Sequence, residues 1–138
     1  MNVNFDAWSI VHELGHVWDI NNNWGLSKGL EEYTGGSTTG RLDPILFLHC
    51  DIGSRKPGCN AAGYFYGDIP PKGSDVNFNR EEDFAESVAA YVFPDEAQQW
   101  VERWHGTIYE ELLWYPDYRE TVRWEYINGL IERTITVP

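Results

Sequence analysis

The chain has 138 residues, a length typical of a single domain. Hydrophobic residues make up 42% of it and charged residues 23%, which argues against disorder, collagen and coiled coil. The net charge is −12, and such an acidic surface disfavours nucleic acid and anionic membranes through long-range repulsion. We therefore expect no nucleic-acid partner. The acidic surface either favours cationic substrates or serves only solubility.

No segment of the sequence is predicted to insert into a membrane, because no run of about 18 apolar residues exists. The first ten residues also lack the basic segment and apolar core of a signal peptide. The compartment stays open on these grounds, because a longer parent chain would carry its own leader.

The first predicted element is a helix over residues 4–22, with Asn4 or Asp6 as its N-cap. Apolar residues recur in it at helical spacing and predict a face that packs into a core. That face is formed by Ala7, Val11, Leu14 and Trp18, and is widened by Ile10 and Val17. At about 100° per residue, a roughly opposite face carries Ser9, His12, His16 and Asp19.

Residues 23–78 are predicted to be mostly irregular, since they hold ten of the 13 glycines and four of the seven prolines. A short helix is expected to begin at Ser27, and residues 45–48 form a buried segment of undecided type. Long irregular stretches in compact domains usually serve a site. We expect this one to build the floor and rim of a cleft.

The two cysteines, Cys50 and Cys59, lie in this stretch and are separated by a turn-rich sequence. A disulfide between them would indicate an oxidising compartment and hence a secreted or extracytoplasmic protein. Two free thiols are the alternative. A zinc site that includes His49 is disfavoured, because His49 and Cys50 are adjacent and point in different directions.

Residues 79–131 are predicted to be helical again. Asn79 is expected to cap the first helix of this region and Pro94 to end it. A second helix is expected over residues 95–104.

The remaining boundaries come from caps and breakers. A capping box at Thr107 opens a short helix, which Pro116 interrupts. The last helix is expected to run from Asp117 to a stop at Gly129. The alternating residues 134–137 are compatible with a strand.

The strongest chemical signal is the sequence His12-Glu13-Leu14-Gly15-His16 within the first helix. Residues four apart stand on one face of a helix, so both imidazoles can bind one metal ion. Glu13 projects beside that face, where it can reach a metal-bound water without binding the metal itself. Zinc suits two imidazoles, and a catalytic zinc site has three protein ligands and an open position. The alternative is a pair of surface histidines on an amphipathic helix.

A third ligand is expected from the acidic start of the helix after residue 79. Glu82 would complete a site of two histidines and one glutamate, and Glu86 lies one turn further on the same face. Glu86 is placed to accept the free ring N–H of a zinc-binding histidine and so fix its tautomer. Glu81 and Asp83 are the competing ligands. The alternative is that Glu82 belongs only to an Asn79 capping box and that Glu86 is solvated.

Two segments of the chain resemble a known family. Residues 12–19 look like the active-site helix of zincin metallopeptidases. Residues 82–86 look like the third-ligand helix of the gluzincin branch, most like the anthrax lethal factor type. The resemblance supports Glu82 as the ligand and Glu86 as its supporting residue. It also matches Asp19 to an aspartate of the family and so implies that Asp19 supports the ligands too.

The same resemblance implies a tyrosine that assists the reaction. Tyr66, which is followed by a glycine, matches it, although it stands farther from Glu82 than the family's tyrosine, and Tyr64 is the alternative. Packing in the core is the non-catalytic interpretation of either tyrosine.

The resemblance implies a mainly α, zincin-like (α+β) fold. Only eleven residues precede His12, so we expect the β-sheet that zincins carry before this helix to be missing and residues 1–138 to correspond to the C-terminal half of the fold. The chain is then either a single domain or a piece of a longer protein that works with an upstream domain or partner chain.

The predicted function is zinc-dependent hydrolysis of peptide bonds in a peptide or protein substrate. Zinc lowers the pKa of its bound water and polarises the scissile carbonyl. Glu13 is the expected general base and Tyr66 an expected donor to the oxyanion. The alternatives are a non-catalytic, zinc-stabilised module that binds peptide or glycan, and an inert fragment.

Overall fold

The computed structural model describes residues 5–34, 79–101 and 117–135. The elements in these ranges are all helical: α1 (Phe5–Asn21), α2 (Gly25–Tyr33), α4 (Arg80–Val92), α5 (Pro94–Val101), the 3₁₀ turn η3 (Tyr118–Glu120) and α7 (Val122–Ile131). No strand occurs among the described residues, so the prediction of a mainly α structure is confirmed for them. No helix in these ranges is long and apolar enough to cross a membrane.

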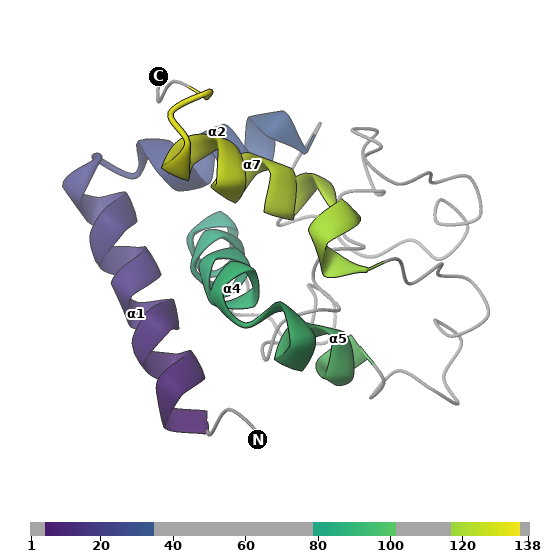
Figure 1. Cartoon of the computed structure of the whole chain (residues 1–138). Coiled ribbons are helices and arrows are strands. Elements are labelled where there is room, and N and C mark those ends of the chain that lie inside the picture. Colours follow the sequence, from purple (N-terminus) through teal and green to yellow (C-terminus); the bar gives the residue numbers. More distant parts are fainter. Residues whose placement is uncertain (1–4, 35–78, 102–116, 136–138) are drawn as a thin grey trace.

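Helix α4 lies at the centre, and α1, α2 and α7 pack around it (Figure 1). The core is formed where α2, α4 and α7 meet, and Val11 and Trp18 of α1 pack against its edge. Its buried side chains are Leu26, Leu30, Phe84, Val88, Tyr126, Ile127 and Leu130. Residues from both ends of the chain therefore enclose the central helix.

The start of α4 agrees with the sequence prediction. The side chain of Asn79 accepts a hydrogen bond from the backbone N–H of Glu82 at 2.9 Å, which satisfies one of the free donors of the first turn. The helix ends at Val92, and Pro94 opens α5 immediately afterwards. Proline suits the first position of a helix because its missing N–H is not needed there.

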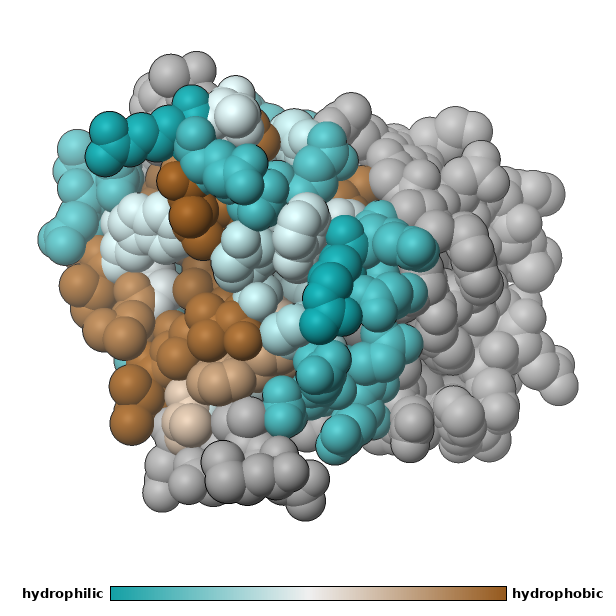
Figure 2. Space-filling view, viewed as in Figure 1, coloured by the Kyte–Doolittle hydropathy of each residue, from teal (hydrophilic) through white to brown (hydrophobic). Residues whose placement is uncertain are grey.

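The predicted orientation of α1 is partly confirmed, since Val11 and Trp18 pack against the core, and wrong for the other side of the expected face. The residues expected in the core include Leu14, Ile10 and Val17, which are 57%, 60% and 51% exposed. Figure 2 shows hydrophobic surface over α1, at the left of the view. The buried residues of α1 are Trp8, His12, Gly15 and Asp19, so the buried face is shifted toward the histidines.

The close packing of α1 on α4 explains this orientation. A Cβ atom at Gly15 would lie 3.0 Å from the Cα of Ala85, so the two backbones approach where both residues are small. The same face of α1 carries His12, whose burial is compensated by two carboxylates of α4. The small residues Gly15 and Ala85, and the pairing of His12 with two carboxylates, therefore shift the buried face of α1 away from its most apolar side.

Two other boundaries differ from the predictions. Helix α2 begins at Gly25, two residues before the expected Ser27. The last region divides into η3, capped by Asp117, and α7, which continues past Gly129 to Ile131.

Gly129 serves a close approach rather than a stop. A Cβ atom at this position would lie 2.5 Å from a side-chain carbon of Ile135. The N–H groups of Thr134 and Ile135 both donate to the carbonyl of Gly129. These two tail residues therefore fold back on α7 and form no strand.

The expectations for residues 45–48, the cysteines, the catalytic tyrosine and the capping box at residue 107 lie outside the described ranges. The residues concerned are Cys50, Cys59, Tyr64, Tyr66 and Thr107.

Candidate metal centre

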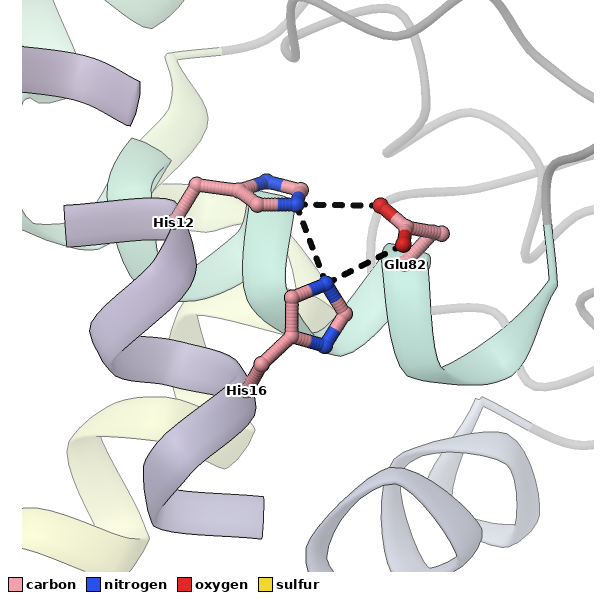
Figure 3. Close-up of side chains that lie close together, drawn as sticks. All are labelled: His12, His16 and Glu82. Atoms are coloured by element: carbon pink, nitrogen blue, oxygen red, sulfur yellow. Dashed lines mark hydrogen bonds and ion pairs between the residues drawn. The ribbon is translucent and has the colours of Figure 1, made fainter. Parts of the chain in front are cut away.

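Three side chains from α1 and α4 converge on one point (Figure 3). The Nε2 atom of His12 lies 3.0 Å from Oε2 of Glu82, and the Nε2 atom of His16 lies 3.1 Å from Oε1 of Glu82. The two Nε2 atoms are 3.1 Å apart. The structure thus brings together the three residues that the sequence predicts as metal ligands.

The spacing and chemistry of these atoms fit a metal ion. Two ligand atoms about 2.05 Å from a tetrahedral zinc are separated by about 3.3 Å. The two Nε2 atoms are 3.1 Å apart, and each lies 3.0–3.1 Å from a different oxygen of Glu82, so one ligand atom from each residue lies within 4.8 Å of the others. Imidazole nitrogen and carboxylate oxygen are both ligands that zinc accepts.

The two residues that compete with Glu82 have other partners. The carboxylate of Glu81 lies 3.9 Å from the guanidinium of Arg80. Asp83 is 2% exposed and accepts two hydrogen bonds from Arg123, at 2.8 and 3.0 Å. Of the three successive acidic residues, Glu82 is the one that contacts the histidines. The backbone N–H of Glu82 donates to the side chain of Asn79, which caps α4. The side chain of Glu82 turns toward α1 instead of completing a capping box.

The histidine of the first ligand position lies between two carboxylates. Its Nε2 faces Glu82 and its Nδ1 lies 3.0 Å from Oε2 of Glu86. Burial alone would lower the pKa of His12, but the hydrogen bonds to Glu82 and Glu86 outweigh it and raise the pKa to about 9. Both ring nitrogens therefore carry protons in the metal-free protein at neutral pH.

The pKa of Glu82 shifts in the opposite direction from that of His12. Its hydrogen bonds to His12 and then His16 lower its pKa to about 2, against the effect of burial. The carboxylate consequently stays ionised throughout the neutral range, as a metal ligand must be.

Glu13 projects from α1 next to the ligands. It is exposed, and it lines a hollow of about 160 Å³ together with Trp8, Ser9, His12 and Glu86. A small molecule or a peptide group in this hollow would therefore be adjacent to both a proposed ligand and an exposed carboxylate. The general-base role expected of Glu13 stays a prediction.

Asp19 makes a structural contact at the far end of α1. It is 1% exposed, and its Oδ1 accepts a hydrogen bond from the backbone N–H of Ser27 at 2.9 Å. This bond anchors the first turn of α2 to the end of α1, beyond His16. The structure thus ties Asp19 to α2, and Tyr64 and Tyr66 are outside the described residues.

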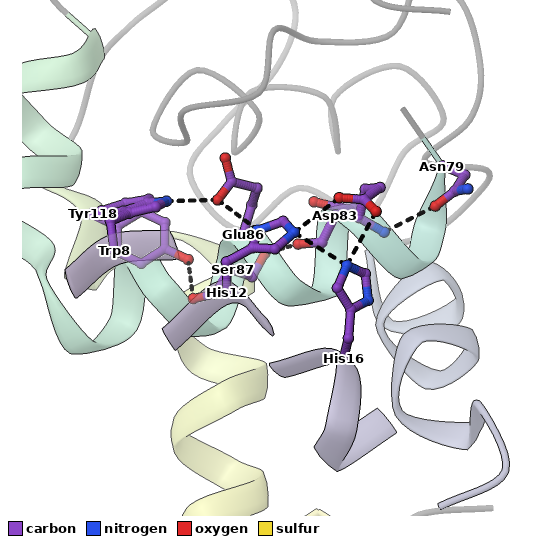
Figure 4. A network of polar contacts seen from close by, with 9 residues as sticks. Trp8, His12, His16, Asn79, Asp83, Glu86, Ser87 and Tyr118 are labelled. Carbon is purple, nitrogen blue, oxygen red and sulfur yellow. Dashed lines mark hydrogen bonds and ion pairs between the residues drawn. The ribbon is translucent and has the colours of Figure 1, made fainter. Parts of the chain in front are cut away.

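The far side of α4 is held by buried polar contacts that the sequence does not predict. Arg123 of α7 is 3% exposed and pairs with Asp83. Burial raises the pKa of Asp83, and the adjacent guanidinium of Arg123 opposes this effect. The hydroxyl of Tyr118 donates to the carbonyl of Ser87 at 3.2 Å, in the same layer (Figure 4). A pairing across 40 residues leaves no local pattern by which it could be found.

No protein-family model, no curated protein and no solved structure matches this chain.

Proposed function

We propose that this chain is a zinc-dependent peptidase in which His12, His16 and Glu82 hold the metal ion. The observation that supports it is the convergence of two Nε2 atoms, 3.1 Å apart, on the carboxylate of Glu82, with one ligand atom from each residue within 4.8 Å of the others. Within the described ranges this cluster has three potential ligands. Three protein ligands with a free position are typical of catalytic zinc, whereas structural zinc is closed by four.

The residues around the ligands support hydrolysis. Zinc, when bound, supplies a Lewis acid that lowers the pKa of water and polarises a carbonyl group. Glu13 lines the hollow beside His12, which supports a role in which it accepts a proton from water and passes it to the leaving amine. Glu86 accepts a hydrogen bond from Nδ1–H of His12. This bond orients the ring so that Nε2 faces the proposed metal position.

Metal binding is tested first. We expect one zinc per chain by elemental analysis after dialysis, and we expect His12→Ala and Glu82→Gln to abolish it. Glu81→Gln is the matched control, because it neutralises the neighbouring carboxylate, which lies near Arg80 instead of the histidines. If Glu81→Gln loses zinc and Glu82→Gln retains it, the ligand assignment is wrong.

Catalysis is tested with Glu13→Gln. This variant keeps the shape of the side chain and all three ligands, so it should bind zinc normally. A general acid–base contributes about 10²- to 10⁴-fold, and we expect a loss of at least ~100-fold in cleavage of a peptide library. Cleavage at the wild-type rate would exclude Glu13 as the base. If both forms bind zinc and neither cleaves any peptide, the zinc-stabilised binding module is the better description.

A further inference from the structure

A second side chain of α1 contacts the carboxylate that orients His12. The indole Nε1–H of Trp8 donates a hydrogen bond of 2.7 Å to Oε2 of Glu86. The same oxygen lies 3.0 Å from Nδ1 of His12. Figure 4 shows Trp8, Glu86 and His12 joined in this order, with the ligand cluster at the end of the series.

The direction of each hydrogen bond follows from the groups involved. An indole N–H can only donate and an ionised carboxylate can only accept. Trp8 and His12 are four residues apart on α1, so they present their donors to the same oxygen from one face of the helix. Two donors at one oxygen specify where that oxygen lies, although the terminal torsion of a glutamate is otherwise broad.

The tryptophan itself is held firmly. Trp8 is 2% exposed, and its ring stacks on Phe93, which follows α4, with centroids 6.2 Å apart. Its N–H is thus a fixed point from which the carboxylate of Glu86 is positioned. A hydrogen bond to a charged group at 2.7 Å is also at the short, strong end of its range.

We propose that Trp8 is a positioning residue of the metal centre, acting through Glu86 on His12. By holding Oε2 opposite Nδ1, it keeps that ring nitrogen protonated as a donor and directs Nε2 toward Glu82 and His16. This inference rests on the proposed metal site and extends it to a residue that does not touch the ion.

The experiment compares two identical substitutions on one helix. Trp8→Phe removes the N–H and keeps an aromatic ring against Phe93. Trp18→Phe is the matched control, because Trp18 packs on Phe84 in the core, with ring centroids 5.7 Å apart. Zinc affinity is measured by competition with a chelator, and stability by urea unfolding of the metal-free forms.

Partners of zinc-binding histidines contribute about 10- to 100-fold to metal affinity. Trp8 is one hydrogen bond farther from the metal position than Glu86. We therefore expect Trp8→Phe to weaken zinc binding about 10-fold, at the lower end of that range. Trp18→Phe should change affinity less than 2-fold. Equal affinities of the two variants would overturn the role of Trp8 and leave the zinc site itself intact. A wild-type chain that binds no zinc would instead overturn the proposed function, and this inference with it.

A double-mutant cycle distinguishes positioning from general packing. If Trp8 acts through Glu86, adding Trp8→Phe to Glu86→Ala, which removes the acceptor oxygen, should cause little further loss of zinc affinity. Losses that multiply would mean that Trp8 supports the site only by its bulk, and would contradict the proposal.

Discussion

The two carboxylates around His12 predict that zinc affinity depends strongly on pH. They raise the pKa of His12 from 6.5 to about 9 in the metal-free protein. A metal ion needs the lone pair of Nε2, so at neutral pH zinc must displace a proton from this ring. The proton that stabilises the metal-free site thus competes with the metal.

The size of the effect follows from the shifted pKa. Below its pKa, a ligand that must lose one proton gains about tenfold in apparent affinity for each pH unit. Between pH 7 and pH 9 we therefore expect zinc affinity to rise by about 50-fold, whereas a histidine of ordinary pKa would give less than about 2-fold.

Chelator competition across this range measures the slope, and a histidine NMR titration of the metal-free protein measures the pKa of His12 directly. Glu86→Gln is the control, because it keeps the size of the side chain and removes one of the two charges. It should lower the pKa of His12 and flatten the dependence. Titration of His12 near 6.5, together with constant zinc affinity above pH 7, would show that the two carboxylates do not hold the proton on this ring.

Stability of the metal-free protein should change in the opposite sense. Because the pKa of His12 is raised, its contribution is complete below pH 6.5 and is lost as the pH rises through about 9. Because the pKa of Glu82 is lowered, its contribution is complete above pH 4.5 and is lost as the pH falls through about 2. Both shifts describe the same contacts, so together they are worth about 3 kcal/mol at most. Thermal unfolding with and without zinc should show a stabilisation by the metal that grows between pH 6.5 and pH 9.

Three further variants test the packing that holds the site. Arg123→Ala leaves Asp83 buried without its partner and should lower the free energy of unfolding by about 3–5 kcal/mol in urea; a loss below about 1 kcal/mol would show that the pair is not buried. Leu14→Ser should change the free energy of unfolding by less than about 0.5 kcal/mol, because Leu14 is 57% exposed. Leu26→Ala, at a residue that is 1% exposed, should lower it by about 2–5 kcal/mol. Similar costs for both would support the orientation of α1 that apolar periodicity predicts. Gly15→Val should cost about 1–3 kcal/mol by forcing α1 away from α4, and should weaken zinc binding as well. Unchanged zinc affinity in a folded Gly15→Val would contradict the close approach.

The parts of the site that the sequence predicts are those governed by local geometry. The spacing of His12 and His16 places them on one face of a helix in any fold. The cap at Asn79 likewise depends only on the next three residues, and α4 begins there. The contact of α1 with α4 follows from the hypothesis that the two imidazoles share a metal ion with a carboxylate, and the side chain of Glu82 contacts both of them.

The orientation of α1 could not be predicted from apolar periodicity. That pattern shows that two faces of a helix differ, and the more apolar face is then assigned to the core. Here the buried face is shifted to the side with Trp8 and His12, because the carboxylates of Glu82 and Glu86 pair with both ring nitrogens of His12. These partners are 70 or more residues away, so a single-helix pattern contains no information about them.

Glu82 and Asp83 show how the core and the site depend on each other. Successive residues on a helix point about 100° apart, so these neighbours face different layers. Glu82 turns to the histidines of α1, and Asp83 turns to the buried guanidinium of Arg123 on α7. We expect the ion pair to fix the rotation of α4 about its axis, and that rotation decides whether Glu82 or one of its acidic neighbours meets the imidazoles. Buried ion pairs often contribute little net stability compared with apolar residues of the same volume. Replacing this pair with Asp83→Leu and Arg123→Met together should thus restore most of the stability lost in Arg123→Ala. If the pair specifies the rotation of α4, the same double variant should still bind zinc more weakly than the wild type, and equal zinc affinity would show that the core alone sets the helix in place.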